Sequence, residues 1–470
     1  MRLEDVGWGI LSALLTLTLL GGPVPASAQP VEVPDTWGGD IWSRPRLTGS
    51  WWGLRDELGK KGVVFDADVL LTPQGVLSGG RDTGWEFWGN ADYTLNVDTG
   101  KLGIWPGGFF KFYADTSFGE SVLPDVGAIV PVNTWAIMPK PNEPTSALMN
   151  ATFMQFLSPK FGLFAGKVFT FDSFKGEFSG DIRNQFMNLG VSIPAALAFV
   201  PISAYGGGVV VLPWEGVVLS AMALDPSGTP TNNDISDAFN DGVTLVASGQ
   251  VTIKPFGLVG HQTVGGVWSS KDRLSIEQDP TNIGLMLLQE RFPRLADPGP
   301  ILRRILERFF PQLLVPVQPL SHEDSTWAVF YGFDQYLWQP TGDPKRGIGV
   351  FFNFGTSDGK ANPIKYSYAM GVGGNGLIPG RPHDNFGVGW ARTQFSDNFV
   401  PFLRQTLALG LDKEDAVEIF YNAALTPWLR MSLDLQVVNP GLQRTLDSSG
   451  TRLVNVETAV VGGVRMYVRF

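Results

Sequence analysis

The sequence contains no cysteine and only three histidines among its 470 residues. The absence of cysteine excludes disulfides, thiolate metal sites and cysteine nucleophiles. The histidines, at positions 261, 322 and 383, lie far apart and form neither an H-x-H nor an H-E-x-x-H motif. We therefore expect no metal site and no bound cofactor.

Basic residues are outnumbered by acidic ones. The chain has 35 Lys and Arg against 45 Asp and Glu, which gives a formal net charge of -10. Binding to nucleic acid requires clustered Lys and Arg. The mild acidity therefore argues against a nucleic-acid partner.

The one long apolar run lies at the N-terminus. Residues 7–22 form it, and Ala26-Ser27-Ala28 follows as a signal-peptidase-like site. We expect residues 1–28 to be a cleaved signal peptide of an exported protein; the alternative is a retained membrane anchor. No later stretch of about 18 residues is apolar and uncharged, so no transmembrane helix is expected.

Alternation of side chains dominates the rest of the sequence. Between Trp85 and Asp98, one set of alternate residues is mostly apolar and the other mostly polar. A helix would mix the two sets, whereas a strand separates them. In a water-filled membrane barrel the polar set would line the channel.

The same alternation recurs at 63–71, 417–425 and 429–437 and in the last residues of the chain. There, apolar residues at 464, 466 and 468 share a face with the terminal Phe470, while Tyr467 and two arginines share the other. A last strand that ends in Phe resembles the signal by which outer-membrane barrels are recognised for assembly. We therefore predict an all-β fold, a transmembrane antiparallel β-barrel; a soluble β-sandwich is the alternative.

The length after the signal peptide is sufficient for 16 strands, or 18, with short turns at one end and longer loops at the other. Residues 29–46 are expected to form an N-terminal arm, and 47–470 the barrel domain. Within that domain we expect a short amphipathic helix at 47–62. Residues 279–324 interrupt the strand rhythm and contain five arginines; this long loop either folds inward and narrows the pore or stays outside.

Several motifs resemble the carbohydrate-selective porin (OprB) family of Gram-negative outer membranes. They begin with LTGSWWGLR at 47–55 and continue with WPGG at 105–108 and SSKD at 269–272. The likeness is clearest in DQYL at 334–337, GLIPGR at 376–381, EIFY at 418–421, LTPW at 425–428 and NPG at 439–441. The resemblance implies a 16-stranded barrel in the outer membrane and a diffusion channel for monosaccharides.

The partners expected on this basis are small sugars, outer-membrane lipid and lipopolysaccharide, and the barrel-assembly machinery, which would recognise the Phe470 strand. The chain would act as a monomer or a homotrimer and would not be an enzyme. Two other functions stay open: a porin for other solutes, such as organic acids or aromatic compounds, and a barrel enzyme such as a lipase. No G-x-S-x-G motif supports the enzyme.

A channel that favours sugars needs charged or amide groups that exchange hydrogen bonds with hydroxyls, and aromatic rings on which sugar rings can slide. The candidates for sugar contact are taken from strand parity, that is, from the set of alternate residues that faces the lumen. Arg381 is added because it belongs to the GLIPGR motif. The predicted lumen-facing residues are Asp66, Asp68, Glu86, Trp88, Asn90, Asp92, Lys111, Asp115, Arg381, Glu418 and Gln436. Each could instead form salt bridges that hold the barrel wall. Aromatic residues near strand ends suit the interfacial girdles, namely Trp85, Tyr421, Trp428 and Tyr467.

Overall fold

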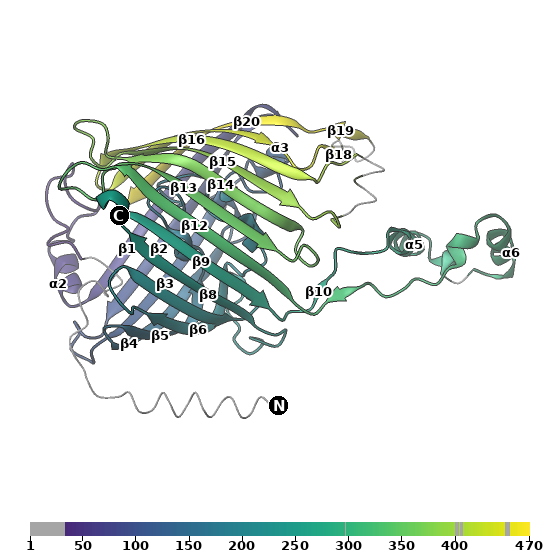
Figure 1. Ribbon diagram of the computed structural model, residues 1–470, viewed down its shortest axis with the longest axis horizontal. Coiled ribbons are helices and arrows are strands. Elements are labelled where there is room, and N and C mark those ends of the chain that lie inside the picture. Colours follow the sequence, from purple (N-terminus) through teal and green to yellow (C-terminus); the bar gives the residue numbers. More distant parts are fainter. Residues whose placement is uncertain (1–32, 297, 400–403, 405–407, 447–451) are drawn as a thin grey trace.

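The computed structural model describes residues 33–470 except 297, 400–403, 405–407 and 447–451. The predicted signal peptide and the first part of the arm lie outside the described residues. Within the described part of the chain, sixteen antiparallel strands form one closed barrel (Figure 1). The prediction of a barrel with 16 strands is confirmed.

The barrel strands follow chain order around the wall, and each pairs with its sequence neighbours. Only short hairpins and turns are needed for this arrangement. The strands are β1 (Val63–Gly80), β2 (Gly84–Asp98), β3 (Gly108–Gly119), β4 (Ser146–Ser158), β5 (Phe161–Phe169), β6 (Ser203–Val211), β7 (Val217–Leu224), β8 (Thr244–Ile253), β9 (Gly260–Ser269), β12 (Thr326–Trp338), β13 (Gly347–Ser357), β14 (Ile364–Asn375), β15 (Asn385–Phe395), β16 (Lys413–Thr426), β17 (Leu429–Asn439) and β20 (Glu457–Arg469).

The first and last strands close the barrel. β1 and β20 pair antiparallel, with Asp68 opposite Arg469, and the N–H of Phe470 donates to the carbonyl of Ala67 at 2.8 Å. The terminal residue is therefore part of the closing seam. β20 pairs with residues 68–80 of β1 along this seam and so closes the barrel, as a spanning structure requires.

The two faces of each strand differ as the sequence alternation predicts. In β16, Val417 and Ile419 are exposed on the outside, whereas Glu418 and Phe420 are buried inside. In β2, Trp85 is 59% exposed and Trp88 is 2% exposed. The outward residues form an apolar surface that suits lipid, and the inward residues face the lumen.

The two ends of the barrel carry different connections. At one end, here called the turn end, the hairpins are short; only Pro427 and Trp428 join β16 to β17. Phe470 and helix α2 (Leu54–Lys60) lie at this end (Figure 1). The opposite end, here called the loop end, carries the long connections.

The N-terminal segment packs under the turn end. Helix α2 is shorter than the expected helix at 47–62, because Gly49, Trp51, Trp52 and Gly53 adopt positive φ angles that an α-helix excludes. Trp37 of the arm is 2% exposed, and its N–H donates to Asp56 at 2.8 Å. The described part of the arm is therefore fixed to the helix.

Two connections at the loop end turn back into the barrel. The first inner loop, residues 120–145, joins β3 to β4 and contains α3 (Leu123–Val126) and a 3-10 helix, η2 (Thr134–Ile137). The second inner loop, residues 170–202, joins β5 to β6 and contains η3 (Phe171–Phe174), α4 (Leu189–Ser192) and η4 (Ala195–Leu197). Buried clusters combine these loops with the inward faces of the wall, for example Phe178 and Phe186 with Phe351 and Phe420. The hydrophobic core of this barrel therefore lies inside its lumen.

The long connection between β9 and β12 lies outside the barrel. A two-stranded ribbon, β10 (Arg273–Leu274) and β11 (His322–Glu323), leads to α5 (Pro280–Arg291), η6 (Pro293–Leu295), α6 (Pro300–Phe309) and η7 (Pro311–Leu314). Figure 1 shows these helices well beyond the loop end. The hypothesis that residues 279–324 fold inward is wrong, and the external alternative holds, because the two inner loops already occupy the lumen.

The remaining elements are small. They are η5 (Pro255–Gly257) in a turn, and the ribbon of β18 (Arg444–Leu446) and β19 (Leu453–Asn455) between β17 and β20. In the part of the chain that the structure describes, no helix is long and apolar enough to span a membrane.

Candidate functional site: the pore lumen

The second inner loop is anchored to the far wall by buried polar side chains. Glu418 of β16, which is fully buried, accepts hydrogen bonds from the N–H groups of Met187 at 2.5 Å and Asn188 at 3.0 Å. Gln436 of β17 accepts a hydrogen bond from the Asn188 amide at 3.1 Å. Because β16 lies almost opposite β5 and β6 in the closed strand order, the loop crosses the lumen.

The first inner loop is held in a similar way. Glu414 of β16 accepts from the N–H groups of Ile129 and Val130, both at 2.8 Å. On the other side, the Trp88 indole donates to the carbonyl of Trp135 at 3.2 Å, and the Asn90 amide donates to Met138 at 3.1 Å. These hydrogen bonds determine where the two inner loops lie, and the position of the loops determines the space that is open to a solute.

Glycines on the inner wall make room for the second inner loop. Phe178 lies directly over Gly349 of β13 and Gly373 of β14; a Cβ atom would be 2.4 Å and 2.7 Å from its ring. Such distances are incompatible with any side chain at these positions unless the loop moves. The glycine-rich stretch 371–376, which has the spacing of a nucleotide-binding motif, instead lies at the end of strand β14 and serves packing.

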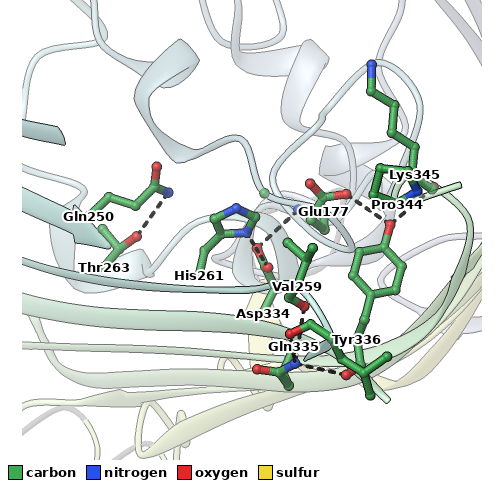
Figure 2. Close-up of polar contacts among 12 residues, drawn as sticks. Glu177, Gln250, Val259, His261, Thr263, Asp334, Gln335, Tyr336, Pro344 and Lys345 are labelled. Carbon is green, nitrogen blue, oxygen red and sulfur yellow. Dashed lines mark hydrogen bonds and ion pairs between the residues drawn. The ribbon is translucent and has the colours of Figure 1, made fainter. Parts of the chain in front are cut away.

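A first cavity of about 1030 Å³ lies between the second inner loop and the wall of β7–β9, β12 and β13. Polar residues from the strands line it together with Phe174 of the loop and Phe330 of β12. Figure 2 shows polar contacts at this cavity, where His261 of β9 lies beside Asp334 of β12. His261 Nδ1 is 2.7 Å from Asp334 Oδ1, and the other carboxylate oxygen accepts from the N–H of Glu177 at 3.2 Å.

A second cavity of about 880 Å³ lies toward the turn end, against β1, β2, β3 and β20. Nearly every side chain around it is polar or charged, and two are tyrosines. The lining residues are Arg46, Asp66, Asp68, Asp92, Thr94, Asn96, Lys111, Tyr113, Arg183, Tyr467 and Arg469.

Carboxylates and guanidinium groups alternate around the second cavity. Arg183 of the second inner loop is bound to Asp92 at 2.8 Å and lies over the ring of Trp135, 4.7 Å from its centre. Arg46 of the arm pairs with Asp66 at 2.8 Å, and the Tyr467 hydroxyl donates to Asp68 at 2.7 Å. These groups offer both donors and acceptors, which is what a polyhydroxylated solute requires.

The predicted lumen residues occupy different kinds of position in the structure. Asp66, Asp68, Asp92 and Lys111 line the second cavity. Trp88, Asn90, Glu418 and Gln436 hold the inner loops, and Asp115 is buried beside Asn90 at 3.0 Å. Glu86 lies opposite Gln74 near the loop end, in neither cavity. Arg381 lies in the turn between β14 and β15.

Arg381 of the GLIPGR motif has a structural role in the turn between β14 and β15. It pairs with Asp384 at 2.7 Å within the same turn. Asp384 also accepts hydrogen bonds from the Tyr421 hydroxyl and, at 2.9 Å, from the N–H of Ala424. Burial raises the pKa of Asp384, but the hydrogen bonds from Arg381, Tyr421 and Ala424 outweigh it and hold that pKa below its usual value. This cluster fixes the turn end of the wall.

The predicted set lacks several residues with lumen contacts, among them Arg183, His261 and Tyr467. Arg183 could not be found because its loop shows no strand alternation, and His261 was noted only as an isolated histidine. Tyr467 was assigned to the interfacial girdle, which is wrong, since its ring is buried inside the barrel in contact with Asp68. Strand parity had already placed Tyr467 on the face opposite Phe470.

Comparison with known proteins gives a consistent picture. The model of the carbohydrate-selective porin, OprB family, matches residues 88–470. Porin B of Pseudomonas aeruginosa is 26% identical over 149 residues, which is 29% of this chain and 31% of Porin B, so the match spans about a third of that relative.

Two solved structures of Pseudomonas putida OprB share the fold. The high-pH structure has a TM-score of 0.73 at 18% identity and covers 92% of this chain and 100% of its own. The low-pH structure has a TM-score of 0.53 at 15% identity, with 91% and 99% covered.

Proposed function

The chain belongs to the carbohydrate-selective porin, OprB family of outer-membrane β-barrels, and from this premise we propose that it is a passive channel for small carbohydrates, above all monosaccharides. The loop end then faces the outside of the cell and the turn end the periplasm. The observation that carries the proposal is the lining of the second cavity, where alternating carboxylates, guanidinium groups and tyrosines surround open space.

The chemistry of this lining fits hydroxyl groups better than ions of one sign. Asp66, Asp92 and their arginine partners are already neutralised by each other, so an entering ion gains little net attraction. A sugar hydroxyl can accept from a guanidinium and donate to a carboxylate without an added charge. We propose Asp68, Asp92 and Lys111 as groups that a passing sugar contacts. Weak, exchangeable contacts of this kind let a solute enter and leave.

The inner loops set the size limit in this proposal. Their packed side chains occupy part of the lumen, so a long oligosaccharide has less room than a single ring. We therefore expect monosaccharides to pass faster than disaccharides.

Liposome swelling tests the proposed function. Detergent-purified, refolded protein would be reconstituted and exposed to glucose, a disaccharide and an amino acid of similar size to glucose. We expect the fastest swelling with glucose. Equal rates for glucose and the amino acid would indicate a general porin, and no swelling with any solute would contradict the channel.

The terminal strand supports a second proposal, about assembly. We propose that the barrel-assembly machinery recognises the strand that ends in Phe470. Phe470 takes part in the seam through the carbonyl of Ala67, so this strand is the one whose pairing completes the barrel. Removing Phe470 should lower the amount of folded protein in the outer membrane, measured by heat-modifiable mobility on gels.

A further inference from the structure

All three histidines lie in the described part of the chain, and of these only His261 lines the first or the second cavity. It belongs to β9, and its side chain is 20% exposed, into the first cavity. Its Nδ1 atom lies 2.7 Å from Asp334 Oδ1 (Figure 2). The carboxylate therefore fixes the orientation of the imidazole ring.

The second ring nitrogen is open to the cavity. Among the described residues, no hydrogen-bond partner is found for His261 Nε2. In Figure 2 this nitrogen lies on the side of the ring away from Asp334. When Nδ1–H donates to the carboxylate, the Nε2 atom of a neutral imidazole is a hydrogen-bond acceptor.

The rest of the cavity complements such an acceptor. Gln250 and Thr263, hydrogen-bonded to each other at 3.3 Å, lie on the same stretch of wall. Phe174 and Phe330 pack edge to face against each other, with 5.9 Å between ring centres, and line the cavity together. A pyranose ring presents hydroxyls around its rim and apolar C–H groups on its faces, so polar strands and an aromatic side suit it.

A purely structural role explains Asp334 but not His261. The oxygen Asp334 Oδ2 accepts from the Glu177 N–H and so holds the second inner loop without help from the imidazole. His261 makes no described hydrogen bond to that loop. Its arrangement is that of an oriented binding group, since a carboxylate that holds one ring nitrogen directs the other toward a ligand.

We propose that His261 is a sugar-binding residue of the first cavity and determines the preference for hydroxylated solutes there. Its Nε2 atom forms a hydrogen bond with a hydroxyl of one monosaccharide unit. Asp334 is the positioning residue that keeps the ring in place. The proposal rests on the proposed sugar channel and adds a sugar-binding site within it.

Sugar block of the ion current in planar bilayers tests the proposal. Glucose is titrated onto single channels of the wild type and of His261→Phe and His261→Gln, and the apparent glucose binding constant and the open-channel salt conductance are recorded. His261→Phe should weaken glucose binding about fivefold, the equivalent of one hydrogen bond. His261→Gln keeps a donor and an acceptor at the site and should restore part of the binding. The salt conductance should change little in both variants.

The chain supplies a matched control. His322 on β11 forms a similar pair with Asp272, with Nδ1 to Oδ1 at 2.9 Å, but lies outside the barrel on the exposed ribbon. His322→Phe should leave glucose binding unchanged. A wild-type channel blocked by glucose, together with equal block in His261→Phe, would overturn the role of His261 while leaving the sugar channel intact. If wild-type channels conduct ions but glucose does not block the current at all, both the sugar-binding site and the sugar channel would be contradicted.

Discussion

Inward polar residues of this barrel divide into those that anchor the inner loops and those that border open space. Glu418 and Asp92 look alike in the sequence, since both are acidic residues at inward positions of alternating strands. In the structure, Glu418 is fully buried beneath the second inner loop, whereas Asp92 borders the second cavity together with Arg183. The difference comes from the loop that happens to cover each position.

Loss of the Glu418 carboxylate should loosen the pore without unfolding the barrel. Glu418→Ala leaves the N–H groups of Met187 and Asn188 without their acceptor, which costs about 1–3 kcal/mol for each buried group. The second inner loop should then leave its position, and single-channel conductance and current noise should rise. Glu418→Gln retains one acceptor oxygen and should show a smaller change. Unaltered conductance in Glu418→Ala would mean that the loop does not limit the pore.

How far the site could be predicted follows from this distinction. Strand parity depends only on neighbours in the chain, so it predicted from the sequence alone that Asp66, Asp68, Asp92 and Lys111 face the lumen. Which cavity they line is seen only in the structure. The partners of Glu418 lie 231 and 230 residues away, in a segment without periodicity. No local pattern carries that pairing, and the same holds for Arg183 and for the His261–Asp334 contact.

At the scale of the element, helix α2 fastens the closing seam. Arg55, with its side chain 2% exposed, donates from Nη2 to Asp66 Oδ1 at 2.7 Å, to the carbonyl of Phe65 at 2.9 Å and to the carbonyl oxygen of Phe470 at 3.0 Å. One guanidinium thus joins the helix, the first strand and the chain end.

Arg55→Ala should destabilise the barrel by about 3 kcal/mol, because a buried charged group with three acceptors is removed. The measurement is the temperature at which the folded band disappears on unheated and heated gels. Lys61→Ala is the matched control, since Lys61 pairs with Glu57 on the exposed side of the same helix and both side chains are over 60% exposed. A similar loss in both variants would contradict the seam role of Arg55.

The turn between β14 and β15 should make stability depend on pH. Because the pKa of Asp384 lies below its value in the unfolded chain, about 3.9, this group stabilises the fold above that pH. The stabilisation is lost as the pH falls through the folded-state pKa. Asp384→Asn should therefore be less resistant to urea than the wild type at pH 7, with the difference shrinking at pH 3. An equal difference at both values would show that the charge of Asp384 is not responsible.

At the scale of the whole molecule, the chain combines a rigid wall with a packed interior and one external appendage. The overall fold was predictable because five stretches of the sequence alternate as membrane strands do. The number of strands came from the chain length and from the resemblance to a family of 16-stranded barrels. Whether residues 279–324 lie inside or outside the pore was not predictable, because an arginine-rich loop can have the same composition in either place. Their external position is consistent with the positions of the two inner loops, which already occupy much of the lumen.

Removal of the external helices should therefore leave the pore unchanged. The N–H of Ser275 donates to the carbonyl of Ser321 at 3.0 Å, so the stem closes below residue 279 and residues 279–318 can be replaced by a short Gly-Ser linker. We expect the same single-channel conductance and the same swelling rate as for the full chain. A marked rise in conductance would restore the idea that this segment constricts the pore.

The absence of cysteine allows the most direct test of the central claim that sugars cross through the lumen past the second cavity. Thr94 lines that cavity, and its neighbour Tyr93 is 42% exposed on the outer face of the same strand. Single cysteines would be placed at Thr94 or at Tyr93, treated with a charged, membrane-impermeant thiol reagent, and glucose flux into proteoliposomes would be measured before and after. The account predicts that Thr94→Cys loses most of its flux on modification and that Tyr93→Cys keeps it. Full flux through a Thr94→Cys channel shown by mass spectrometry to be modified would contradict it.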